Sequence, residues 1–472
     1  MQTRQTDVAI IGTGTAGMNA YRAARAAGKR AIVIESGVYG TTCARVGCMP
    51  SKLLIAAAEA AHAIHEAPGF GVHVDGPVRV HGREVMQRVR SERDRFVGFI
   101  LDAVASYPED DKVLGFARFE SDTVLVVDDH TRIEAQAVVI ATGSTPVVFD
   151  QFKPLGDRLI VNDDVFDWHD LPRRVAVFGP GVIGLELGQA LARLGVHVRM
   201  FGVQGLLGGI ADPDVRADAL AAFQAEFYLD TDAQVHSLER VGDEVEITYV
   251  NLDGKTVVER FDYVLAATGR RPNVSGLGLE NTRATLDARG MPSFDPHTMQ
   301  IEDLPIFIAG DANNVVPLLH EASDEGRIAG DNAARYPQVV PGHRRAPIAV
   351  VFSDPQIAVV GGGMGKLVPG SFVTGAVSFD DQGRSRVMRK NRGRLHVYAD
   401  RQTGQFLGAE MVGPAAEHIA HLLAWSVQQK LTVKAMLDMP FYHPVIEEGL
   451  RTALRDAQAK LDAVAGSADK AA

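Results

Sequence analysis

Two cysteines, the only ones among 472 residues, lie in the segment Cys43-Ala-Arg-Val-Gly-Cys48. A structural disulfide stabilises most when it joins distant segments, whereas this pair would close a loop of a few residues. In a chain with no other cysteine, the spacing favours redox catalysis or metal binding over a structural role. A tetrahedral metal site would need further ligands, and no second Cys pair or spaced His pair stands nearby. Two unrelated buried thiols are the remaining interpretation.

A second group that could do chemistry stands near the other end of the chain, in Phe441-Tyr-His443-Pro-Val-Ile-Glu-Glu448. A carboxylate can fix the tautomer of an imidazole and raise its basicity, which would make His443 a general base for a thiol. The chain has 15 histidines, and the local pattern alone also fits a surface histidine. An amphipathic helix is predicted from Glu447 to about Leu461.

The N-terminal segment predicts a dinucleotide-binding turn. A strand over Val8–Ile11 runs into Gly12, Gly14 and Gly17, and a helix and a second strand ending at Glu35 follow. The first glycine permits the tight turn, the second lets backbone approach a pyrophosphate, and the third allows the helix to pack on the strand. The phosphates would meet N–H groups at the helix N-terminus, and the carboxylate would accept hydrogen bonds from a ribose.

The same pattern returns with Gly179, Gly181 and Gly184, and the two copies align without a gap. Two dinucleotide-binding units imply two dinucleotides, which indicates electron transfer between redox cofactors. Gly202 stands where the first copy has its terminal acid, and Arg199 lies within the second strand. NAD sites usually carry a carboxylate there, whereas NADP sites add arginine, so the sequence leaves the nicotinamide dinucleotide undetermined.

Three further apolar strands end in residues that could face a cofactor: Thr142-Gly143, Thr268-Gly269-Arg270 and Gly310-Asp311. Each also fits an ordinary buried strand and turn. The run Gly361–Gly365 has no helical pattern after it and is predicted to be a loop.

Composition excludes several classes of protein. The net charge of -11 argues against nucleic acid or an anionic membrane as the main partner. No apolar run reaches the roughly 18 residues of a membrane span. The N-terminus enters a strand too early for a secretory signal, so we expect a cytoplasmic, reducing environment. The length suggests about three domains.

The order and spacing of these motifs, with Met49-Pro50-Ser51-Lys52 after the second cysteine, resemble the flavoprotein (pyridine nucleotide) disulfide oxidoreductases. Within that family the chain is most similar to the dihydrolipoamide dehydrogenases, and the resemblance covers about residues 6 to 458. It implies an α/β fold with two Rossmann-like dinucleotide-binding domains, for FAD and NAD(P), and a C-terminal α+β dimerisation domain. The implied parts are 1–147 (FAD domain with the redox disulfide), 148–272 (NAD(P) domain), 273–345 (central segment), 346–461 (dimerisation domain) and 462–472 (disordered tail).

The resemblance also implies roles for the residues named above. Cys43 would exchange with the substrate and Cys48 would face the flavin. His443, oriented by Glu448, would act on the disulfide of the partner in a homodimer with a shared active site. Lys52 would lie near the flavin and pair with Glu186. The implied cofactor-binding residues are Gly12, Gly14, Gly17, Glu35, Thr42, Lys52, Ala117, Thr142, Gly143, Asp311, Gly179, Gly181, Gly184, Glu186, Gly269 and Arg270; no metal is expected.

The implied reaction is oxidation of dihydrolipoamide, free or on a lipoyl domain, with NAD as acceptor and NADP not excluded. The enzyme would serve a 2-oxoacid dehydrogenase or glycine-cleavage complex. Reduction of another small disulfide such as glutathione, or a scaffold role in a complex, are alternatives. Mercuric reduction would call for an additional C-terminal Cys pair, and soluble transhydrogenases lack the Cys43–Cys48 pair. Thr41-Thr42 and Ala44-Arg45 depart from the usual approach to the redox pair, and Arg45 would either lower a thiol pKa or face solvent.

Overall fold

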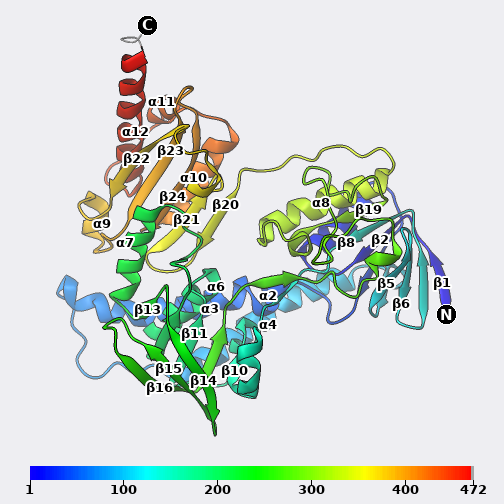
Figure 1. Cartoon of the computed structure of the whole chain (residues 1–472), viewed down its shortest axis with the longest axis horizontal. Coiled ribbons are helices and arrows are strands. Elements are labelled where there is room, and N and C mark those ends of the chain that lie inside the picture. The colour runs from blue at the N-terminus through cyan, green and yellow to red at the C-terminus, as the bar shows by residue number, and fades with distance from the viewer. Residues whose placement is uncertain (469–472) are drawn as a thin grey trace. The chain divides into compact units, whose positions relative to one another are not determined.

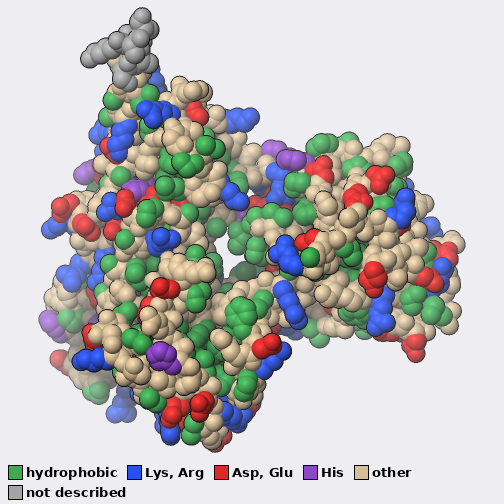
Figure 2. Space-filling view, viewed as in Figure 1, with side chains coloured by type: hydrophobic (Ala, Val, Ile, Leu, Met, Phe, Trp, Pro, Cys, Tyr) green, Lys and Arg blue, Asp and Glu red, His purple; other side chains and the backbone are tan. Residues whose placement is uncertain are grey.

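The computed structural model describes residues 1–468 and forms two compact units. The first unit comprises residues 1–53, 87–147 and 269–344, and the second comprises 54–86, 148–268 and the chain from 345 onward. Among the described residues, no helix is both long and apolar enough to cross a membrane. The face shown in Figure 2 carries acidic and basic side chains interspersed with one another.

The first unit is built on a five-stranded parallel sheet, whose central strands are apolar throughout because both faces of the sheet are covered. Helix α1 (Thr15–Ala26) and helix α8 (Leu319–Arg335) pack together in the core on one face, and α8 lies along β19, β8 and β2 in Figure 1. The strand order is β19 (Ile306–Ile308), β8 (Ala137–Ile140), β2 (Val8–Ile11), β3 (Ala31–Glu35) and β4 (Lys112–Leu114).

Small residues set the contact between α1 and α8. A Cβ atom on Gly326 would lie 2.2 Å from the carbonyl oxygen of Ala16, and one on Gly330 would lie 2.4 Å from that of Ala20. Because backbone meets backbone there, any side chain at these glycines would push the helices apart.

Shorter elements complete the first unit. A four-stranded sheet packs against the other side of the parallel sheet through a shared apolar core. The strand order of the four-stranded sheet is β1 (Gln2–Gln5), β7 (Thr131–Glu134), β6 (Val124–Val127) and β5 (Ala117–Ser121). A separate two-stranded sheet pairs β9 (Ser144–Pro146) with β18 (Arg270–Pro272). The helices are α2 (Thr42–Val46), α3 (Cys48–Glu66) and α4 (Gly82–Ala105), and α3 and α4 extend into the second unit.

The second unit contains another five-stranded parallel sheet, covered by a three-stranded antiparallel sheet with an aromatic core between them. Helices α6 (Val182–Arg193) and α7 (Pro213–Gln224) belong to this part. The strands of the two sheets are β10 (Leu159–Ile160), β17 (Tyr263–Ala266), β11 (Arg174–Phe178), β12 (His197–Phe201) and β13 (Tyr228–Asp230), and β14 (Val235–Val241), β15 (Glu244–Val250) and β16 (Thr256–Phe261).

The C-terminal part of the second unit is an antiparallel sheet with two long helices, α10 (Ala416–Gln428) and α12 (Glu447–Ala468), in its apolar core. Helix α12 runs along β22 and β23 (Figure 1). The strand order is β20 (Ile348–Val351), β21 (Gln356–Val360), β24 (Phe406–Gly413), β23 (Arg394–Asp400) and β22 (Phe372–Ser378).

The predicted fold class, an α/β chain with two dinucleotide-binding sheets and a C-terminal α+β part, is confirmed. One detail is wrong: the disordered tail is predicted to begin at 462, yet residues 462–468 continue α12, while 469–472 lie outside the described residues. Three of these seven residues are alanine, the strongest helix former, which favours continuation of the helix. The limits of the four domains remain predictions.

Candidate functional site

The first glycine-rich turn joins β2 to α1, and its backbone is closely packed. Gly12 has a φ of +106°, and a Cβ there would lie 2.3 Å from the carbonyl oxygen of Ala141. A Cβ on Gly17 would lie 2.0 Å from the carbonyl oxygen of Gly12. Gly14 is the N-cap of α1, receives no side-chain cap, and has nothing within 4 Å of its Cβ position. The first N–H groups of the helix therefore face open space, as a pyrophosphate site requires.

Glu35, at the end of β3, is held by the turn itself. Its Oε2 accepts hydrogen bonds from Thr13 N at 3.0 Å and Thr13 Oγ1 at 2.7 Å, and its Oε1 accepts one from Gly37 N at 3.0 Å. These three donors fix the carboxylate at the end of the strand, beside the turn. Thr13 was missed in the sequence, although it is the variable residue between the first two glycines.

A cavity of about 580 Å³ lies over this turn. Among the residues predicted to bind a cofactor, seven line it, whereas Gly17 packs behind the turn and Lys52 and Asp311 are not part of the lining. The cradle fits a flavin dinucleotide because it combines a helix N-terminus without a side-chain cap, an acid at the strand end and a cavity over the turn. The seven residues are Gly12, Gly14, Glu35, Thr42, Ala117, Thr142 and Gly143.

Asp311 and Arg270 meet through a residue that the sequence did not single out. Ser144 Oγ donates to Asp311 Oδ2 at 2.7 Å, while Arg270 donates through Nε to Ser144 Oγ at 2.8 Å and through Nη2 to the Ser144 carbonyl at 2.7 Å. All three belong to the first unit. The signal for Ser144 was its place directly after Thr142-Gly143 at the end of β8.

The second glycine-rich turn, between β11 and α6, repeats the geometry of the first. Gly179 also has a φ of +106°, and its Cβ would lie 2.3 Å from the carbonyl oxygen of Ala267. A Cβ on Gly184 would lie 1.9 Å from the carbonyl oxygen of Gly179. Gly181 is an uncapped N-cap with open space around its Cβ position. This turn therefore also offers a phosphate site.

The two turns differ at the strand end. A Cβ on Gly202 would lie 2.7 Å from Cγ of Pro180 and 3.0 Å from Cα of Thr231. Arg199 does not compensate, because its Nε donates to Glu259 Oε2 at 3.1 Å and its guanidinium stacks 4.8 Å above the ring of Tyr228.

Glu186 and Gly269 complete the predicted set. Glu186 is buried in α6, and its Oε1 accepts a hydrogen bond from Phe352 N at 3.0 Å. Gly269 has a φ of +109° and directly follows Thr268 after β17. Lys52 belongs to the first unit and Glu186 to the second, so their predicted pairing remains a prediction.

The two cysteines are thiols that contact one another. Cys43 lies in α2, and Cys48 begins α3. Gly47 between these helices lets the chain fold back, since a Cβ there would lie 3.1 Å from Cα of Cys43. The pKa of the Cys43 thiol is raised, first by its hydrogen bond with Cys48 and then by burial, while the charge of Lys52 opposes this rise.

Arg45 is half-buried and is tied to the loop before α2. Its Nη2 donates to the carbonyl oxygen of Tyr39 at 2.9 Å, which fastens α2 to that loop. The influence of Arg45 on a thiol pKa remains a prediction.

His443 and Glu448 are brought together in the second unit. His443 Nδ1 lies 3.0 Å from Glu448 Oε2, which also accepts a hydrogen bond from Val445 N at 3.3 Å. Arg451 donates to Glu448 Oε1 at 3.0 Å, and the side chain of His443 is 80% exposed. The hydrogen bond from His443, aided by Val445 and Arg451, lowers the pKa of Glu448. Arg451 was missed, and its signal was the spacing of three residues on a predicted helix.

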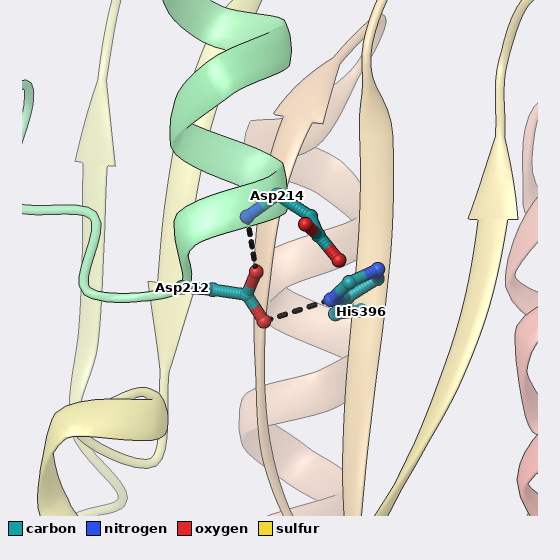
Figure 3. A group of neighbouring side chains, drawn as sticks. All are labelled: Asp212, Asp214 and His396. Atoms are coloured by element: carbon teal, nitrogen blue, oxygen red, sulfur yellow. Dashed lines mark hydrogen bonds and ion pairs between the residues drawn. The ribbon is translucent and has the colours of Figure 1, made fainter.

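A further cluster joins the two parts of the second unit. Asp212, the N-cap of α7, accepts hydrogen bonds at Oδ1 from the N–H group of Asp214 and at Oδ2 from His396 Nδ1 (Figure 3). Oδ1 also accepts one from the N–H group of Val215, and Oδ2 accepts one from Tyr398 Oη. Burial opposes ionisation of Asp212, but the bonds from His396 and Tyr398 outweigh it and bring the pKa to about 2. Because both oxygens are fully engaged, the cluster is a structural joint between α7 and β23 rather than a metal site.

The comparisons with known proteins agree with this geometry. The family profile described as pyridine nucleotide-disulphide oxidoreductase matches residues 6–326, and that of the family's dimerisation domain matches 348–454. A dihydrolipoyl dehydrogenase from Chlamydia trachomatis is 28% identical over 456 residues, 94% of each chain. A mercuric reductase from Streptomyces lividans is 30% identical over 459 residues, 93% of each chain.

Two solved structures share the fold. LpdA from Mycobacterium tuberculosis has a TM-score of 0.79 at 25% identity, covering 96% of this chain and 99% of that one. The HOCl-induced flavoprotein disulfide reductase RclA from Escherichia coli has a TM-score of 0.78 at 22% identity, covering 96% and 99%, and shows likeness of fold alone. The chain therefore belongs to the pyridine nucleotide-disulphide oxidoreductase family, as an enzyme that uses FAD and a nicotinamide dinucleotide and carries the family's dimerisation domain.

Proposed function

We propose that the protein is a dihydrolipoyl dehydrogenase, which oxidises dihydrolipoamide to lipoamide and reduces NAD⁺. The observation that carries this proposal is the hydrogen-bonded Cys43–Cys48 pair at the start of α3. The similarity to named dihydrolipoyl dehydrogenases over 94% of the chain supports it. FAD, when bound over the first glycine-rich turn, supplies the two-electron relay between the dithiol and the nicotinamide.

In the proposed reaction, one thiol of dihydrolipoamide gives its proton to His443 and attacks Cys43 of the oxidised pair. A bond from substrate sulfur to Cys43 forms as the Cys43–Cys48 bond breaks, and Cys48 leaves as a thiolate. The second substrate thiol then attacks the bound substrate sulfur, which forms lipoamide and releases Cys43. The substrate loses two electrons and two protons; NAD⁺ gains a hydride and one proton is released.

The positions of the thiols support this division of roles. Cys48 begins a helix of 19 residues, whose positive end stabilises a thiolate. In the reduced pair the two thiols are hydrogen-bonded to each other, and this bond and burial raise the pKa of the Cys43 thiol. Cys43 is then the thiol that exchanges with substrate.

The base belongs to a different unit from the thiols. Glu448 orients the imidazole through Nδ1, which leaves the other ring nitrogen to take the proton. The high exposure of His443 suits a base that a second copy of the chain would cover. We therefore propose a homodimer in which His443 serves the cysteine pair of the partner, and a 2-oxoacid dehydrogenase or glycine-cleavage complex as the source of the dithiol.

A second candidate is NAD(P)H-dependent reduction of another small disulfide. The observation behind it is that the chain is about equally similar to relatives with different substrates, a mercuric reductase at 30% identity and the dihydrolipoyl dehydrogenases at 28%, so similarity does not single out dihydrolipoamide. Mercuric reduction itself is not favoured, because both cysteines of the chain lie in the redox loop and a separate pair to deliver the metal is lacking.

Steady-state turnover of the purified, FAD-loaded protein tests the proposal. Dihydrolipoamide with NAD⁺ is expected to turn over, and glutathione disulfide with NADH or NADPH is expected to react at least about tenfold more slowly, because a site built for one disulfide discriminates by several kcal/mol. No oxidation of dihydrolipoamide with either nicotinamide would overturn the proposal, and rapid glutathione reduction would establish the second candidate.

Three variants test the roles of the residues. Cys43→Ser and Cys48→Ser should each abolish turnover, and His443→Gln should lower kcat by about 10²- to 10⁴-fold, as loss of a general base does. Arg455→Gln, an exposed change on the same helix as Glu448, is a control that should leave turnover unchanged. Full activity of His443→Gln at neutral pH would contradict its assignment as the base.

A further inference from the structure

The residues after β12 show why the second dinucleotide site lacks a ribose acid. The space that a side chain at Gly202 would need is taken by the ring of Pro180, whose Cγ and Cδ lie 2.7 and 2.9 Å from the place a Cβ would occupy, and by backbone at Thr231. The proline ring cannot swing aside as a flexible side chain can, whereas the contact of 3.0 Å with Cα of Thr231 asks for a shift of only a few tenths of an ångström. A carboxylate at 202 is therefore sterically excluded for as long as proline stands at 180.

The first copy shows what has been exchanged. There Thr13 occupies the position of Pro180 and donates both its N–H and its hydroxyl to Glu35. Proline has neither donor. The first site thus pairs a donor with a carboxylate, whereas the second pairs a proline ring with a glycine, so the two sites differ at both positions.

The loop at 202–205 also provides no cation for a 2′-phosphate. The stretch from Gly202 to Asp212 contains no Lys or Arg. The nearest strand arginine, Arg199, is bound to Glu259 and stacked on Tyr228. NADP sites characteristically supply a guanidinium at this place.

Two carboxylates flank the loop instead. Gly202 N donates to the carbonyl oxygen of Asp230 at 2.7 Å, and Gln204 N donates to Asp232 Oδ1 at 3.1 Å. Asp232 N in turn donates to Asp230 Oδ1 at 2.9 Å. The loop is therefore fastened to the end of β13, which places two negative side chains beside the turn.

We propose that Pro180 and Gly202 form a specificity-determining pair: they remove the side-chain contact to the adenosine ribose and leave discrimination against NADP(H) to the charges of Asp230 and Asp232. The inference rests on the proposed function only for the presence of a nicotinamide dinucleotide. The second site then binds NAD(H) without a ribose carboxylate and repels the additional phosphate of NADP(H).

Titration calorimetry of NAD⁺ and NADP⁺ into the oxidised, FAD-loaded protein tests this without any disulfide substrate. NADP⁺ is expected to bind at least about tenfold more weakly than NAD⁺. Replacing both aspartates, Asp230→Asn with Asp232→Asn, should tighten NADP⁺ about three- to fivefold and change NAD⁺ less than twofold, since exposed charges act weakly. Asp253→Asn, in the turn between β15 and β16, removes one negative charge elsewhere in the same unit and is a control that should change neither affinity.

Equal binding of NADP⁺ and NAD⁺, or an unchanged ratio in the double aspartate variant, would overturn the proposal. Binding of neither dinucleotide would instead contradict the proposed function. The role of Pro180 and Gly202 is tested by the double variant Pro180→Thr with Gly202→Glu, which gives the second site the residue types that the first site has at Thr13 and Glu35. That variant should bind NAD⁺ roughly tenfold more tightly, the effect of one hydrogen bond to a charged group. Gly202→Glu alone should lose thermal stability without this gain, and an equal gain in the single variant would show that Pro180 has no part in it.

Discussion

The two glycine-rich turns of this chain have the same backbone and different chemistry. Gly12 and Gly179 share a φ of +106°, and each would place a Cβ 2.3 Å from a carbonyl oxygen of the neighbouring strand end. At the next position the first turn carries Thr13, which binds Glu35, while the second carries Pro180, which fills the space beside Gly202. Steric constraints therefore set the backbone shape of both glycine-rich turns. The side chains at the turn and at the following strand end determine whether a carboxylate is available to the ribose of a bound dinucleotide.

The two turns also differ in what supports them. The first is backed by α8, which meets α1 through Gly326 and Gly330. The second leads into α6, whose Glu186 and Gln189 accept hydrogen bonds from the N–H groups of Phe352 and Asp354 in the C-terminal part of the same unit. The helix after the turn is therefore held by close backbone contact in one unit and by polar side chains in the other.

The largest expected effect comes from the glycine at the third position of each turn. Gly17→Ala and Gly184→Ala should each cost more than about 3 kcal/mol of stability, because the new Cβ meets a carbonyl oxygen near 2 Å. Thermal unfolding and visible absorbance are the measurements: Gly17→Ala should lose bound flavin, whereas Gly184→Ala should keep it and lose nicotinamide binding. Gly98→Ala, with open space around its Cβ, is the control. Equal flavin loss in both variants would show that the turns do not act separately.

Removing the charge at the first strand end should have the next largest effect. Glu35→Gln keeps the size of the side chain but replaces an anion that holds Thr13 and Gly37. We expect FAD to bind about 10- to 100-fold more weakly, as loss of a charge-assisted hydrogen bond costs about 1.5–3 kcal/mol. Flavin release measured by fluorescence on dilution checks this, and unchanged FAD affinity would contradict the assignment of Glu35 as the ribose acid.

The polar joint of the second unit predicts a pH-dependent stability. The folded pKa of Asp212, about 2, lies below its ordinary value near 3.8, so its contribution is present above pH 4 and is lost as the pH falls toward 2. That difference corresponds to about 2 kcal/mol for this buried carboxylate. Asp212→Asn keeps a helix cap but should lose this amount at pH 7, and the stability gap from wild type, measured by denaturant unfolding, should close in acid. If the stability difference between wild type and Asp212→Asn persists at pH 2, the destabilisation comes from altered packing and not from loss of the carboxylate charge.

The smallest effect is expected at the residue that differs between the turns. Thr13→Val removes the hydroxyl donor to Glu35 but keeps the N–H donor, so FAD affinity should fall by about 1 kcal/mol, roughly fivefold. Equilibrium dialysis of FAD measures it. A loss as large as that of Glu35→Gln would mean that the hydroxyl, and not the carboxylate, makes the main contact.

Sequence alone determined the features that depend on local sterics. The spacing of Gly12, Gly14 and Gly17 predicted a turn that only glycine can form, and its repeat predicted the second sheet, because φ and Cβ clashes are properties of neighbouring residues. The cysteine spacing likewise favoured a pair that acts together, in redox catalysis or metal binding, since a loop of a few residues keeps the two side chains in reach.

Tertiary structure decided the contacts between residues that are far apart in the chain. Ser144 bridges Arg270 to Asp311, which is 167 residues away from it, and Asp212 binds His396 across 184 residues. No local pattern marks such pairs, because each depends on how separate sheets and helices pack. The missing acid at Gly202 depends on packing in the same way: the sequence showed that the acid is missing, and only the tertiary structure showed that a side chain there would clash with the ring of Pro180.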